Sequence, residues 1–169
     1  MKHRTIVSLL AVVLVLAGAS PVFAAADMGA ALEYLKNQQN ADGGFGSGFS
    51  PGSTVGSTAD AVLAIIAGGG DPANFAQDGN TPLTYLAEQA GSVSISGDLA
   101  KLIMAAVAAG QNPREFGGVD AVAKLEGTIG PGGRIGTDND TFVSHLLAVL
   151  ALRSVERPIP EAAVTYIEE

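Results

Sequence analysis

Helical segments of two kinds alternate along this 169-residue chain, and the alternation constrains its fold more than any other feature. Segments 28–39 and 81–90 place leucines at helical spacing among polar residues, which is typical of a helix that packs on one side. Segments 61–67, 99–109 and 141–152 are almost wholly apolar, so helices there must be covered on more than one side. The pattern predicts outer helices that face solvent and inner helices that lie between neighbours.

Glycine and proline separate these segments, and part of their spacing is periodic. Pro72 and Phe75 recur 41 residues later as Pro113 and Phe116, which indicates an internal repeat. Further helices are expected at 119–126 and 161–169. The last of these resembles the first amphipathic segment, so the chain is expected to contain three and a half helical hairpins.

No segment shows the alternation with a period of two that a half-buried strand needs, so we expect an all-α chain. The first apolar helix should begin within 57–60, where Ser57 or Thr58 can cap it. Hairpins with one outer and one inner helix fit an α/α toroid (α/α barrel), an open α-solenoid or a small bundle. Periodicity alone leaves these alternatives open.

The stretch 38–46 has the most specific turn chemistry. It carries Gln39, Asp42, Gly43, Gly44 and Phe45. The glycines permit the positive φ found at helix C-termini, the aspartate favours a turn, and the phenylalanine can fold back onto the preceding helix. The turn 132–136 is expected to take its place in the third hairpin, with one residue inserted.

The sequence from Gln39 to Gly46, QNADGGFG, resembles the QxxDGGFG form of the repeat found in terpene cyclase and prenyltransferase α/α toroids, with Phe45 in place of the usual Trp. Squalene cyclase-like enzymes, prenyltransferase-type repeat proteins and the cobalamin-binding intrinsic factor group share that fold. The resemblance implies a toroid repeat domain over 27–169, in which the motif is structural and not catalytic. Family toroids have more hairpins, which implies either an incomplete toroid from a longer protein or a short protein that pairs through its open end.

The first 26 residues have the features of a secretory signal peptide: basic residues 2–4, an apolar run 6–17 and small residues at 21–26. The apolar run is shorter than the roughly 18 residues of a membrane span. Cleavage is expected after Ala24 or Ala26, which leaves a secreted mature chain without a membrane span. Removal of Lys2 and Arg4 from nine basic residues leaves seven against 17 acidic ones, a net charge of −10. Such a charge disfavours nucleic acid and anionic lipid as partners.

A polar cluster precedes the third apolar segment and invites comparison with class II terpene cyclases, whose DxDD motif is usually followed by Thr. Alignment on Thr141 puts Asp140 at the last acid, Asn139 at the proton donor and Thr137 at the first acid. Asn cannot supply a proton, so cyclase chemistry does not carry over. Asp138 and Asp140 are predicted to cap the helix, and a ligand-binding role for them is the alternative.

Metal and nucleophilic chemistry find little support. His145 is the only histidine of the mature chain and there is no cysteine, which excludes a zinc site of the prenyltransferase kind and a thioester. Asp138 and Asp140 lack the ligand number and spacing of an EF-hand, so no metal and no cofactor are expected. His145 is either a hydrogen-bonded structural residue or a ligand-binding residue that faces the lumen.

Two function classes are open. One is a secreted, non-catalytic module that binds a small molecule, a glycan or a companion domain. The other is a terpene cyclase/mutase-family enzyme whose catalytic repeats lie beyond residue 169. Fold alone does not decide between them, although the low aromatic content, 5%, suits the binding module better than a lumen that stabilises carbocations.

Overall fold

The computed structural model describes residues 27–168, and in this part the chain is all-α. The helices are α2 (Met28–Asn37), α3 (Val55–Ala67), α4 (Pro82–Gln89), α5 (Ser96–Ala108), α6 (Ala121–Glu126), α7 (Phe142–Ser154) and α8 (Glu161–Glu168), with two short 3-10 helices, η1 (Pro72–Asn74) and η2 (Phe116–Gly118). Extended pairing in the described residues is limited to isolated bridges. The expected signal peptide lies outside the described residues.

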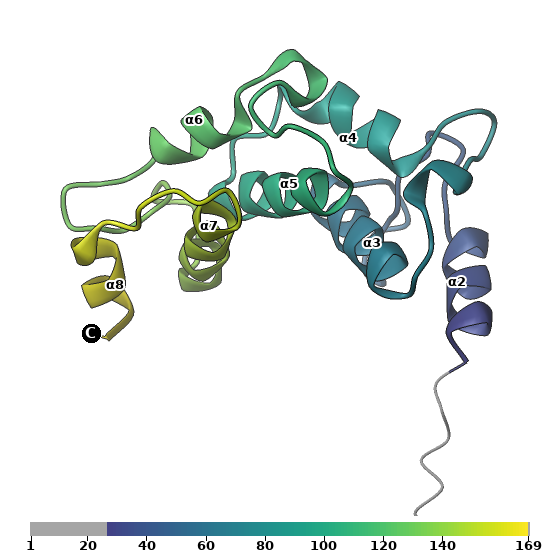
Figure 1. The fold of residues 1–169 in the computed structure, drawn as a ribbon, viewed down its shortest axis with the longest axis horizontal. Coiled ribbons are helices and arrows are strands. Elements are labelled where there is room, and N and C mark those ends of the chain that lie inside the picture. Colours follow the sequence, from purple (N-terminus) through teal and green to yellow (C-terminus); the bar gives the residue numbers. More distant parts are fainter. Residues whose placement is uncertain (1–26, 169) are drawn as a thin grey trace, which may run out of the picture.

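The helices form two layers along an open arc (Figure 1). α3, α5 and α7 pack side by side as the inner row, α4 lies on α3, and α6 lies on α5. Each of these outer helices thus packs on the inner helix that precedes it in the chain. α2 and α8 stand at the two ends of the arc. The alternation of amphipathic and apolar segments therefore predicts the two layers correctly.

Small residues let the inner helices approach closely. Ala59 on α3, Ala100 and Ala105 on α5, and Ala148 and Ala151 on α7 are all fully buried. Leucine and isoleucine side chains fill the space between the inner row and the outer helices, as Leu86 of α4 and Leu125 of α6 do. This arrangement explains why the inner segments are apolar around most of their circumference.

Threonine side chains cap two helices of the inner row. Thr54 caps α3 and Thr141 caps α7, each by accepting a hydrogen bond from the backbone N–H three residues later. The prediction that Ser57 or Thr58 caps α3 is wrong, because the helix begins a turn earlier. Thr58 is instead fully buried and bonds the preceding hairpin turn. None of the described helices combines the length and the apolar character needed to cross a bilayer.

Candidate functional site

The first hairpin turn is held by the side chain of Gln39. Its Nε2 atom donates to the carbonyl oxygens of Gly43, at 2.8 Å, and Phe75, at 3.1 Å. The first bond closes the turn, and the second ties it to the linker that follows α3. Because both acceptors are carbonyls, the orientation of the amide is defined, and Oε1 is left buried without a partner.

Asp42 and the two glycines shape the tip of this turn. The Asp42 carboxylate accepts from the Gly44 N–H at 2.9 Å and from the Ser53 hydroxyl at 2.7 Å. Gly43 has φ +84°, and a Cβ there would lie 2.6 Å from the carbonyl oxygen of Thr81. The turn is thus seated on the backbone at the start of α4, where only glycine fits.

Phe45 anchors the turn in a small apolar cluster. Its side chain is 4% exposed and packs with Ile65 of α3 and with Phe75 of the linker. Its backbone N–H donates to the Thr58 hydroxyl at 2.9 Å. Every residue of the predicted motif therefore contacts other parts of the protein itself.

The third hairpin repeats this turn without an insertion. The antiparallel bridge between Ile129 and Ile135 matches that between Gln39 and Phe45. Gly133 has φ +83° and lies against the backbone of α8, as Gly43 lies against that of α4. The predicted alignment with one inserted residue is therefore wrong, because Gly133 and not Gly132 takes the place of Gly43.

His145 is the counterpart of Thr58, since each residue is the fourth after its helix cap. Its Nδ1 accepts from the Ile135 N–H at 2.9 Å, and its Nε2 lies 3.0 Å from the carbonyl oxygen of Ala163. A backbone N–H at Nδ1 and a carbonyl at Nε2 define a neutral ring with its proton on Nε2. The side chain is fully buried, and Tyr166 packs edge-on at 4.8 Å between ring centroids. His145 therefore links α7, the third turn and α8.

Asp138 and Asp140 do not cap α7, contrary to the sequence prediction, because Thr141 does. Asp140 accepts instead from the backbone N–H groups of Ser96 (2.9 Å) and Thr137 (2.8 Å). Burial disfavours its charge, but these hydrogen bonds outweigh burial and lower the pKa of Asp140. Asp138 is fully exposed and 3.8 Å from the Arg134 guanidinium. Asp140 and His145 thus form hydrogen bonds with backbone groups, and Asp138 is exposed to solvent.

Sequence reasoning missed a group of charges on the inner helices. Lys101 of α5 pairs with Asp60 of α3 at 2.6 Å. Asp98 lies beside Gly56 of α3, and burial raises its pKa, an effect that Lys101 opposes and that Asp60 and Asp140 reinforce. Residues 57–60 were predicted only as a helix start, so nothing in the sequence pattern indicated this group.

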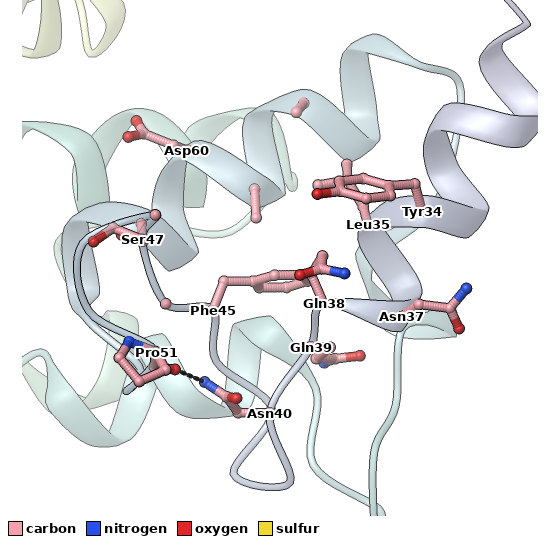
Figure 2. A pocket seen from close by; sticks show the side chains of 15 residues that line it. Tyr34, Leu35, Asn37, Gln38, Gln39, Asn40, Phe45, Ser47, Pro51 and Asp60 are labelled. Atoms are coloured by element: carbon pink, nitrogen blue, oxygen red, sulfur yellow. Dashed lines mark hydrogen bonds between the residues drawn. The ribbon is translucent and has the colours of Figure 1, made fainter.

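Sequence reasoning also missed a cleft of about 740 Å³ at the α2 end of the arc. Tyr34 and Leu35 of α2 lie on one side and Asp60 of α3 on the other, with Phe45 between them (Figure 2). The loop after the first turn forms one wall, where the Asn40 amide donates to the Pro51 carbonyl oxygen at 3.0 Å. The remaining lining is uncharged: Asn37, Gln38, Gln39, Gly46, Ser47, Gly48, Ser57, Ala61 and Ala64.

This cleft combines an exposed aromatic ring, side-chain amides and hydroxyls with a floor of leucine, phenylalanine and alanine. Such a surface can bind a neutral or amphipathic partner through apolar contact and hydrogen bonds. No group of three or more metal-ligating side chains occurs within residues 27–168. Comparison with known proteins gives no match, whether against protein-family models, curated proteins or solved structures.

Proposed function

We propose that this chain is an exported repeat protein of the α/α-toroid type that binds a partner in the cleft between α2 and α3 and is not a catalyst. The observation that carries the proposal is the cleft itself, which is large, mostly uncharged and lined by both apolar and hydrogen-bonding groups. Partners that suit it are a small molecule, a glycan or a companion domain. The QNADGGFG motif supports the toroid class, and the features of residues 1–26 support export.

The hydrogen bonds of Asp140 and His145 and the identity of Asn139 argue against catalysis by this cluster. Asp140 is committed to backbone N–H groups and His145 to the third turn and α8. Asn139, at the position of the cyclase proton donor, is exposed and cannot donate a proton as an acid does. The alternative, a terpene cyclase/mutase-family enzyme with further repeats, needs an acid from outside these residues.

A single fluorescent label tests the proposal directly. The sequence has no cysteine, so Asn37→Cys places one environment-sensitive dye in the lining of the cleft, and Asn139→Cys places the same dye at an exposed position outside that lining as a control. The mature protein is titrated with oligosaccharides, isoprenoid diphosphates and apolar helical peptides. We expect saturable changes in emission at position 37 and none at position 139.

Two results would overturn the proposal. One is an absence of any saturable response at position 37, together with conversion of squalene or a prenyl diphosphate by the natural protein. The other concerns export: N-terminal sequencing of the material from the producing cells should begin at Ala25 or Asp27. An intact Met1 in the cytoplasm would contradict the secreted location.

A further inference from the structure

The outer helix α2 exposes residues whose counterparts are buried in α4. The segments EYLKNQQ and TYLAEQA align Tyr34 with Tyr85 and Leu35 with Leu86. Tyr34 is 64% exposed and Leu35 is half-buried, whereas Tyr85 is 9% exposed and Leu86 is fully buried. Tyr85 and Leu86 are buried because α4 packs on α3, the inner helix that precedes it. Within the described residues, α2 has no inner helix before it.

The inner helix α3 shows the same difference on its edge toward the cleft. Ala64 is exposed, whereas its counterparts Ala105 on α5 and Ala151 on α7 are fully buried. Asp98 and Ser144 contact the preceding helix of the inner row, α3 and α5 respectively. Ala105 and Ala151 each follow one of them by seven residues and so share that face of the helix. The cleft therefore has the position that one more member of the inner row would occupy.

The two contacts already present in the row define what such a helix presents. Gly56 of α3 lies against Asp98 of α5, and Gly97 of α5 lies against Ser144 of α7, where a Cβ on the glycine would be 2.9 Å from the hydroxyl. Three residues after each glycine comes a fully buried alanine, Ala59 or Ala100. Glycine and alanine at this spacing share one face of a helix and permit close approach of two backbones.

A larger apolar residue completes the face one turn further along, Leu63 on α3 and Met104 on α5. The pattern is therefore Gly-x-x-Ala-x-x-x-Leu/Met. At the cleft, the position equivalent to Asp98 and Ser144 is Ser57, a small residue that leaves room for a glycine of an incoming helix.

We infer that the cleft binds an apolar helix of a partner protein with the face Gly-x-x-Ala-x-x-x-Leu/Met, parallel to α3 and covered from outside by α2. This inference rests on the proposed function and names the class of partner. A second copy of the chain does not supply this helix. The matching faces of its α3 and α5 are already covered, and α7 carries the bulkier Val143, Leu146 and Leu150 at these positions.

A synthetic peptide copying residues 94–110, which contain α5, tests the inference. The matched control peptide carries Gly97→Val and Ala100→Leu, the residues that α7 has there. Binding of labelled peptide to the mature protein is measured by fluorescence anisotropy. We expect the control peptide to bind at least tenfold more weakly, because the two larger side chains prevent close approach.

Protein variants locate the binding surface. Ala64→Lys places a charge in the cleft at an exposed position and should weaken binding of the unmodified peptide at least tenfold. Leu150→Lys, at the opposite edge of the inner row, should leave it unchanged. Thermal melting of both variants verifies that the fold is intact.

Five results would overturn the inference. Equal binding of the two peptides would show that the glycine–alanine face is not what the protein recognises. Equal effects of the two lysine substitutions would show that the cleft is not the binding surface. Self-association of the protein, measured by sedimentation and abolished by Ala64→Lys, would make a second copy the occupant. Peptide binding that is lost when residues 1–26 are retained would make the chain's own apolar segment the occupant. Binding of a saccharide without the peptide would refute the helix and leave the proposed function standing.

Discussion

His145 offers the sharpest test of how the third hairpin is held. His145→Ala leaves the buried Ile135 N–H and Ala163 carbonyl without partners and removes a fully buried ring. An unsatisfied buried group costs about 1–3 kcal/mol, so the two groups and the new cavity together should lower the free energy of unfolding by about 3–5 kcal/mol. This is a large part of the roughly 5–15 kcal/mol that stabilises a typical domain.

His145→Thr is the matched variant, because Thr58 accepts the equivalent backbone hydrogen bond in the first hairpin. The Phe45 N–H meets the Thr58 hydroxyl at 2.9 Å, the same distance as from the Ile135 N–H to Nδ1 of His145. Threonine should therefore restore the bond to Ile135 but not the one to Ala163. We expect a loss of about 1–3 kcal/mol for this variant.

Chemical denaturation of the mature protein, followed by circular dichroism, measures both losses. The two variants should share one denaturant slope and differ in midpoint, His145→Ala being lower. Equal destabilisation by the two substitutions would refute the equivalence of His145 and Thr58. No destabilisation by either would refute the role of His145 in holding the turn and α8.

Two further predictions concern the turns and the inner charges. Gly43→Ala and Gly133→Ala should each lower the free energy of unfolding by about 1–3 kcal/mol, because both glycines have positive φ and face the backbone of the following outer helix. Gly132→Ala, where a Cβ meets open space, should change the melting temperature little. Equal effects at all three positions would contradict the assignment of the turn. Asp98→Asn should raise the melting temperature at pH 7, because burial raises the pKa of Asp98 above its unfolded value and so makes its charge destabilising in the folded state. The gain should fade as the pH approaches 3, where the folded and unfolded states both bind the proton. A gain in melting temperature that persists at pH 3 would show that the charge is not its cause.

Local sequence was sufficient to predict most of the helices. Periodic leucines, apolar runs and glycine–proline breaks identify segments close to the observed helices, and the inner-versus-outer assignment follows from how much of each helix is apolar. The role of Phe45 as a buried anchor could also be predicted, because a large apolar residue directly after a glycine turn can fold back onto the preceding helix. These features depend on interactions within a few residues or on the burial of one helix face.

The start of α3 and the register of the third turn were not accessible in this way. Thr54 rather than Ser57 caps α3, and Gly133 rather than Gly132 matches Gly43. Several neighbouring threonines, serines and glycines are locally equivalent for these tasks. At the third turn, contact with the backbone of α8 distinguishes Gly133. At α3, the backbone of Phe45 accepts from the Thr54 N–H and donates to the Thr58 hydroxyl.

The same limit applies to the candidate site. Tyr34 and Tyr85 are each followed by leucine and, three residues later, by glutamine, yet Tyr34 is exposed at the cleft and Tyr85 is buried. Likewise, the sequence around His145 is compatible with a ligand-binding role as well as with a structural one, and only the tertiary structure places Ile135 and Ala163 at its two nitrogens. The sequence by itself thus determined which faces are apolar and where the chain turns. Only the tertiary structure decided which of those faces are covered, because burial depends on the neighbouring helix and not on the residue's own segment.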